Sequence, residues 1–425
     1  MTARSDTPRD GAKLLYFTAA YRPGSMAIPV HTELLVALRA RGYPSAIVTL
    51  AQPGQREPIA YEPDGELPVY RIAISRGLRD RLANRYARTR LVYPYLLTAA
   101  RYLGPWLRAR LAADPELLLQ IEMAFPLGAV VRRALAGTAA RTVVTLHGGD
   151  VLQPDDDTPY GYASAPATQR ELRRVFAGVS RVRAMAPLLA RAAEGFGCDP
   201  AKIATIPLNV SGGFYPTEPL PALRAASRGA VLAELGLPAD ARLLITSGRV
   251  LPIKGFDTLV DALPAVIARH PSTHLLLYGP DRGGTIDALR AQVAALGLGE
   301  RVRFLGTLPF DGQGRFLAAA DLSVIPSTLD GFNRHGVEAG AYGTPVVAST
   351  SAGIADFVAE YGAGRTLAPR DPATLAAAIA TLLGDPVAWA AASAGAVRLA
   401  DACRTDRVAD ALAALYDTTP RAGGR

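Results

Sequence analysis

Two cations near the middle of the chain could bind a diphosphate. Arg249 follows the apolar run 243–246, and Lys254 precedes Gly255, where a helix is expected to start. Cations placed there can neutralise the charge that develops on a phosphate leaving group. The plainer interpretation is two surface cations. It is weakened because Lys254 is one of only three lysines in a chain with 43 arginines.

About 80 residues later, segment 326–347 predicts a strand end at Pro326, a loop, and a short helix from near Arg334 to Gly343. The loop holds Asp330, Gly331, Phe332 and Asn333. It would bring backbone N–H groups and a helix N-terminus to one point, which suits a phosphate or a sugar hydroxyl.

Glu338 lies eight positions after Asp330, inside the expected helix, where its carboxylate could accept hydrogen bonds from a ribose. The alternative is that Asp330 is a turn or N-cap residue and that Glu338 is a solvated helix residue.

The first half of the chain adds three candidates. Gly24 and Ser25 are two small residues in the loop that follows the apolar segment 14–19. His147 follows the apolar strand 142–146 and begins the sequence His-Gly-Gly-Asp. A histidine in that position is more often structural when it stands alone.

Apolar segments alternate with amphipathic helical stretches in both halves, which predicts a parallel, doubly wound sheet in each. The fold class expected is therefore α/β, with two tandem Rossmann-like domains. The expected organisation comprises an N-terminal domain at 13–210, a linker at 211–228, a nucleotide-sugar-binding domain at 229–400, and a C-terminal helix at 401–417. This helix could return to pack on the N-terminal domain.

Together these segments resemble the family 4 retaining glycosyltransferases, which have the GT-B fold with parallel sheets facing a central cleft. Asp330 and Glu338 keep the spacing of the family's E-x7-E element, and Gly343–Val347 fits its G-x-P-V-V strand. Residues 248–255 are similar to the family's G-R-x4-K-G signature, and residues 147–150 to its H-G-x-D. The resemblance covers about residues 13–400.

Four positions depart from the family pattern. Asp330 replaces a Glu, Asn333 replaces a Gly, Ser25 stands where the family usually has a second glycine, and Leu208 precedes Asn209. The shorter acid at position 330 bears on the identity of the donor sugar.

The resemblance also implies roles. His147 and Asp330 are the expected catalytic residues that face the transferred sugar, and Glu338 is expected to bind the ribose. The other expected donor-binding residues are Gly24, Ser25, Arg249, Lys254, Gly331, Phe332 and Asn333.

The implied activity is retaining transfer of a sugar from a nucleotide diphosphate, UDP-sugar first and GDP-sugar next. The acceptor would be a hydroxyl of a cell-envelope glycan, a glycolipid or a small secondary metabolite.

No cofactor is expected, and no metal, because Arg249 and Lys254 supply the positive charge. The acidic run 155–157 is interpreted as a solvated loop. The alternatives are a phosphorylase or nucleotide-sugar epimerase of the same fold, and a non-catalytic sugar-nucleotide-binding protein.

Segment 76–110 carries nine Arg and one Asp, interleaved with Tyr and Trp. Its charge of +8 equals the net charge of the whole chain. One interpretation is peripheral contact with an anionic membrane; the other is a solvated helical arm. Nucleic acid is not an expected partner, because no recognition motif accompanies the charge.

No apolar run approaches the roughly 18 residues of a membrane span. A cytoplasmic location is expected, with the inner face of the membrane as the alternative.

Overall fold

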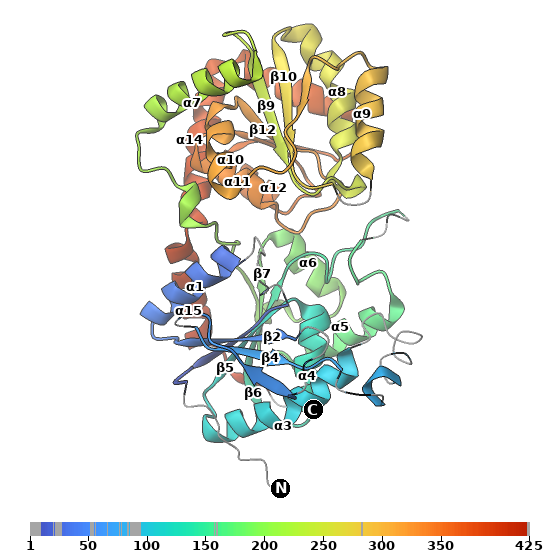
Figure 1. Ribbon diagram of the computed structural model, residues 1–425, viewed down its shortest axis with the longest axis vertical. Helices are drawn as coiled ribbons and strands as arrows, with labels where there is room; N and C mark the ends of the chain where they lie inside the picture. The colour runs from blue at the N-terminus through green and yellow to red at the C-terminus, as the bar shows by residue number, and fades with distance from the viewer. Residues whose placement is uncertain are drawn as a thin grey trace. The chain divides into compact units, whose positions relative to one another are not determined.

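The computed structural model describes residues 10–19, 21, 28–51, 55, 57–65, 67–75, 77, 79–82, 85, 95–156, 158, 160–281 and 284–422. The chain forms two compact units. Unit 1 comprises Met1–Gln153, Tyr160–Ile206 and Thr405–Arg425, and unit 2 comprises Pro154–Pro159 and Pro207–Arg404. After the short segment Pro154–Pro159, the chain enters unit 2 again for most of its second half, and it returns to unit 1 for its last helix (Figure 1).

Unit 1 is built on a mostly parallel sheet. Its strands lie in the order β3 (Ile59–Tyr61), β4 (Val69–Ile72), β2 (Ser45–Leu50), β1 (Leu14–Phe17), β5 (Leu118–Glu122), β6 (Ala140–Leu146), β7 (Arg181–Ala184) and β8 (Ile203–Thr205). Only β3 and the short β15 (Arg421–Ala422), which pairs with β6, run antiparallel among these described strands. The strand order reverses between β1 and β5. In open α/β sheets, ligands bind beyond the carboxyl ends of the strands at such a point.

The helices of unit 1 are α1 (Ile28–Ala40), α3 (Leu96–Ala113), α4 (Ala129–Leu135), α5 (Pro166–Gly178), α6 (Pro187–Gly195) and α15 (Thr405–Asp417). Helices α1 and α15 lie side by side (Figure 1). Leu34 and Leu38 of α1 share one buried cluster with Leu412 and Tyr416 of α15. The C-terminal helix is thus part of the core of unit 1.

Unit 2 has a fully parallel sheet in the order β11 (Val302–Phe304), β10 (Thr273–Tyr278), β9 (Arg242–Ser247), β12 (Leu322–Ile325), β13 (Val346–Ser349) and β14 (Gly364–Leu367). Its helices are α7 (Leu220–Leu235), α8 (Phe256–Arg269), α9 (Thr285–Ala295), α10 (Phe310–Ala319), α11 (Arg334–Ala341), α12 (Ile354–Tyr361), α13 (Pro372–Gly384) and α14 (Pro386–Ala402). The order reverses between β9 and β12. The loops after these two strands carry Arg249, Lys254 and Asp330.

Residues 211–228, predicted as a linker, include the first part of helix α7 in the structure. Helix α7 begins at Leu220 with Pro221 in its first turn, a position where proline favours a helix. The rings of Phe214 and Phe310 pack edge to face at 4.6 Å. Arg224 donates to the backbone oxygens of Tyr342 and Ala320. The segment is therefore built into unit 2.

Within the described residues, no single helix is long and apolar enough to cross a membrane. Among the described helices, α13 and α14 taken together meet that test of length and composition, and they are bent by 100° at their junction.

Candidate functional site

The loop after β9 brings Lys254 close to the end of β12. A short 3-10 turn, Pro252–Lys254, ends at Gly255, whose φ is +62°. A Cβ at Gly255 would lie 2.1 Å from the carbonyl oxygen of Pro326, so only glycine allows this close approach. The amide of Thr328 donates to the carbonyl of Ile253 at 2.9 Å, which ties the two loops together.

Lys254 and Asp330 form the central ion pair of this region. Lys254 Nζ lies 2.5 Å from Asp330 Oδ2, and Asn333 Nδ2 donates to the same oxygen at 2.9 Å. The side chains of Lys254 and Asp330 are 12% and 14% exposed. The backbone of Asp330 is fixed by hydrogen bonds to Ser351 and Gly353. The structure thus brings together a residue predicted to bind phosphate and a residue predicted to bind the sugar.

Asn333 occupies a backbone conformation that explains why the family usually has glycine there. Its φ is +76°, and asparagine is one of the few residues other than glycine that adopt positive φ. Asn333 stands directly before α11, and its amide holds Asp330. Next to it, Gly331 is buried, and the ring of Phe332 packs against that of Phe357 at 5.8 Å.

Glu338 is buried on α11, so the alternative of a solvated helix residue is wrong. Its Oε1 lies 2.7 Å from Nε of Arg334. Burial raises the pKa of the Glu338 carboxyl, and Arg334 opposes that rise. The ribose contact stays a prediction.

Arg249 differs from Lys254 in being exposed. Within the described part of the chain, its guanidinium takes part in no ion pair. It follows Gly248, whose carbonyl oxygen would lie 2.0 Å from a Cβ placed on Gly279. Two glycines therefore let the ends of β9 and β10 approach closely beside Arg249, whose phosphate contact also stays a prediction.

In unit 1, the ends of β5 and β6 bring His147 into contact with Glu122, which was not among the residues predicted from the sequence. His147 Nε2 lies 2.5 Å from Glu122 Oε2. Burial opposes ionisation of Glu122, but the hydrogen bond and charge of His147 lower its pKa to about 2. Burial also opposes protonation of His147, but Glu122 raises the pKa of the imidazole. The pair is therefore stabilised as imidazolium and carboxylate.

Asp150 fixes the loop that carries His147. Its carboxylate accepts hydrogen bonds from the backbone N–H groups of His147, Gly148 and Ala124 at 2.8–3.1 Å. Burial raises the pKa of the Asp150 carboxyl. The signal for Glu122 was available in the sequence, since it is the one charged residue in the mostly apolar segment 117–123.

Three residues named from the sequence, Gly24, Ser25 and Asp157, lie outside the described residues. Asp156 is paired with Arg370. Across the described ranges, no group of three or more His, Cys, Asp or Glu side chains is placed to hold a metal ion.

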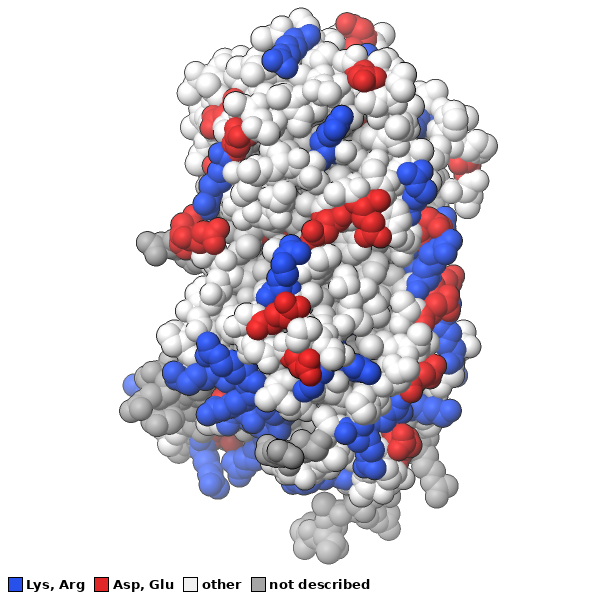
Figure 2. Space-filling model, turned by 180° about the vertical axis from the view of Figure 1, so that it is seen from behind, with Lys and Arg blue, Asp and Glu red and all other residues white. Residues whose placement is uncertain are grey.

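Most of 76–94 also lies outside the described residues, but its C-terminal continuation is described. Arg110 is buried and forms an ion pair with Asp10 at 2.8 Å, and the Trp106 ring packs on Tyr70 at 5.0 Å. Arg110 and Trp106 therefore stabilise the fold of unit 1. On the face drawn in Figure 2, other basic side chains gather over unit 1.

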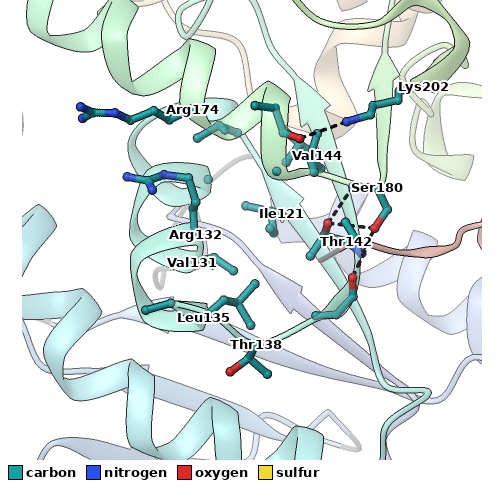
Figure 3. Close-up of a pocket in the computed structure, with 18 of the residues that line it drawn as sticks. Ile121, Val131, Arg132, Leu135, Thr138, Thr142, Val144, Arg174, Ser180 and Lys202 are labelled. Carbon is teal, nitrogen blue, oxygen red and sulfur yellow. Dashed lines mark hydrogen bonds between the residues drawn. The ribbon is translucent and has the colours of Figure 1, made fainter. Parts of the chain in front are cut away.

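A cavity of about 920 Å³ in unit 1 contains none of the predicted site residues. Figure 3 shows it bounded by apolar side chains of α4 and β6, with Arg132, Arg174 and Lys202 around it. Two of its polar lining residues, Thr142 and Ser180, are hydrogen-bonded to each other. The chemistry predicted from the sequence is located elsewhere.

Two family models match the chain. The model described as "Glycosyl transferase 4-like domain" matches residues 28–209, and the model described as "Glycosyl transferases group 1" matches residues 241–385.

Curated relatives are named D-inositol 3-phosphate glycosyltransferase. The protein from Thermobispora bispora is 37% identical over 200 residues, which cover 45% of this chain and 47% of the relative. The protein from Kineococcus radiotolerans is 34% identical over 236 residues, covering 52% and 53%. The matched part thus spans about half the length of these relatives.

Solved structures show the fold. Sucrose-phosphate synthase from Thermosynechococcus elongatus superposes with a TM-score of 0.71 at 21% identity, over 95% of this chain and 98% of the other. HepE from Anabaena in complex with UDP-glucose gives 0.65 at 20% identity, over 94% and 98%. These likenesses and the two parallel-sheet units confirm the expected GT-B fold class.

Proposed function

Since the chain belongs to the family 4-type glycosyltransferases of the GT-B fold, we propose that it transfers a sugar from a nucleotide diphosphate to an acceptor hydroxyl with retention of configuration. The observation that carries the proposal is the contact between Lys254 and Asp330 at the carboxyl end of the unit 2 sheet. A UDP-sugar is the proposed donor, with GDP-sugar next. The relation to a protein crystallised with UDP-glucose supports this order.

The proposed mechanism depends on positioning and on charge. Lys254 and Arg249 stabilise the negative charge that develops on the leaving diphosphate. Glu338 binds the ribose, while Asp330 and His147 hold hydroxyls of the transferred sugar. No protein nucleophile or metal is required in this scheme.

For the acceptor, we propose a hydroxyl of a small polyol or of a cell-envelope glycan or glycolipid. The names of the curated relatives make inositol 3-phosphate the first acceptor to assay. Phosphorylase, epimerase and non-catalytic binding are the competing functions.

A panel of UDP- and GDP-sugars, each incubated with and without inositol 3-phosphate or simple polyols, tests the proposal. We expect acceptor-dependent release of the nucleoside diphosphate and NMR signals of a glycoside with the donor's anomeric configuration. Release of sugar 1-phosphate in added phosphate would indicate a phosphorylase, and isomerised donor an epimerase. Donor binding with no turnover in any mixture would leave the non-catalytic function.

We also propose that segment 76–110 contacts an anionic membrane. Among its described residues, Arg101 is 53% exposed and Leu97 is 39% exposed on the same helix, α3. Cosedimentation should increase with the anionic lipid content of vesicles and decrease with salt. Equal cosedimentation with neutral and anionic vesicles would favour a solvated arm.

A further inference from the structure

A chain of buried hydrogen bonds leads from the C-terminal helix to His147. The hydroxyl of Tyr416 on α15 donates to Oε1 of Gln120 on β5 at 3.1 Å. Gln120 Nε2 then donates to Oε1 of Glu122 at 3.0 Å. The other carboxylate oxygen of Glu122 accepts from His147. Three contacts thus connect residues 416 and 147.

The members of this chain have little freedom to rearrange. Tyr416 and Gln120 are fully buried, and Glu122 is 4% exposed. The second N–H of the Gln120 amide donates to Thr145 Oγ1 at 2.5 Å, so both donors and the acceptor oxygen of this amide are used. A buried polar group that loses its partner is strongly disfavoured, because no water replaces it. The Tyr416 hydroxyl therefore helps to hold the amide with its nitrogen toward Glu122.

We propose that Tyr416 and Gln120 are positioning residues that hold the Glu122 carboxylate against His147, so that helix α15 forms part of the unit 1 site. This inference rests on the proposed function only for the role of His147 in turnover. The contact chain itself is tested independently of activity.

The placement of Tyr416 is determined by several contacts. Its ring packs edge to face against Tyr43 at 5.1 Å, and its carbonyl accepts from the guanidinium of Arg141 at 2.5 Å. The ion pair of Arg41 with Asp410 holds the same helix. Loss of the Tyr416 hydroxyl alone should therefore leave α15 in place.

Tyr43 offers a matched control. Its hydroxyl donates to Asp417 at 2.5 Å, also on α15, and does not take part in the chain to His147. Tyr43→Phe and Tyr416→Phe each remove one oxygen from neighbouring rings on the same helix interface. Only the second change breaks the chain.

Other titratable groups face the His147–Glu122 pair from the elements around it. They are retained in both variants, so they cannot produce a difference between them. These groups are Asp150 on the His147 loop, Arg183 on β7, His31 on α1 and Tyr16 on β1.

The experiment is NMR titration of the five histidines in the full chain, with the His147 signal assigned from a His147→Asn variant. We expect His147 to lose its proton at lower pH in Tyr416→Phe than in the wild type, because the carboxylate beside it is less well held. Tyr43→Phe should titrate as the wild type. Turnover by Tyr416→Phe should fall about three- to tenfold on the alkaline side, with the donor KM changed less than twofold, as expected for lost alignment.

An unchanged His147 titration in Tyr416→Phe, or the same change in Tyr43→Phe, would overturn the inference. Gln120→Leu removes the amide at similar volume and should lower the His147 titration in the same direction, which provides a second variant. Full activity in His147→Ala would remove the proposed role of His147 in turnover. The titration would still test the contact chain, because it does not depend on activity.

Discussion

Lys254 Nζ and Asp330 Oδ2 lie 2.5 Å apart, although 76 positions separate the two residues in the chain. Each side chain is less than 15% exposed, so the contact between them is largely shielded from water. Asp330 therefore helps to place the ammonium that we expect to meet the donor phosphate. Substitutions of these two residues should not be additive, because they share one contact.

Lys254→Ala should lower kcat by about 10²–10³-fold, because a charge that stabilises the leaving phosphate is lost. Steady-state kinetics with saturating donor provides the measurement. Lys202→Ala is a control that removes the same group from unit 1, where Lys202 donates to the carbonyls of Phe176 and Ala177. Wild-type turnover in a folded Lys254→Ala protein would remove the phosphate assignment. Lys254→Arg should retain partial activity, because a planar guanidinium does not take the place of an ammonium.

Substitutions of Asp330 and of Glu338 should change different kinetic parameters. Glu338→Ala should mainly raise the donor KM, because a ribose contact is made equally in the ground and transition states. Asp330→Asn should mainly lower kcat. Asp330→Glu should shift donor preference and retain some activity, although Lys254 and Asn333 must make room for the added methylene. Equal losses in the same parameter would mean that the two carboxylates have no separate roles.

The His147–Glu122 pair predicts a defined pH dependence. The depressed pKa of Glu122, about 2, gives stability that is present above its ordinary value of 4.5 and is lost as pH falls toward 2. The raised pKa of His147 gives stability that is fully present below 6.5 and is lost as pH rises through the folded-state value. Urea unfolding of the wild type and Glu122→Gln should therefore differ most between pH 4.5 and 6.5.

The same substitution should change the activity profile. In Glu122→Gln, the imidazole lacks its anionic partner, so kcat should begin to fall at a lower pH than in the wild type. Rate measurements from pH 5 to 9 provide the check. An alkaline limb at the wild-type position would show that the ionisation of His147 does not control turnover.

Asn333→Gly should retain most activity, because glycine adopts the positive φ at this position and is the residue usual in the family. It removes one hydrogen bond to Asp330, so a loss of about twofold to tenfold in kcat is expected. Asn333→Val should lower the melting temperature further, because a β-branched residue is strained at this φ. Equal melting temperatures for the two variants would contradict the backbone explanation.

Activity should be unchanged in excess EDTA, because Lys254 and Arg249 are proposed to supply the positive charge. Turnover with and without the chelator, followed by added magnesium or manganese, gives the test. Activity that is lost and then restored by either metal would redirect attention to Asp155 and Asp156.

The sequence by itself determined the fold class and indicated the candidate site residues of unit 2. Alternating apolar strands and helices predict parallel sheets because each strand must be followed by a crossover. The spacing from Asp330 to Glu338 and the Arg249–Lys254 segment are local patterns, so they were visible without a structure. The positive φ of Asn333 agrees with the glycine usual in the family at that position.

Tertiary structure alone decided which distant residues meet. The contacts of Lys254 with Asp330 and of Glu122 with His147 depend on strand order, and the contact of Tyr416 with Gln120 depends on the return of α15 to unit 1. The position of α7 was likewise decided by packing, because proline favours a helix start as well as a linker. Glu338 and Arg110 become buried only when the helices and strands pack against each other. Local sequence does not encode that burial.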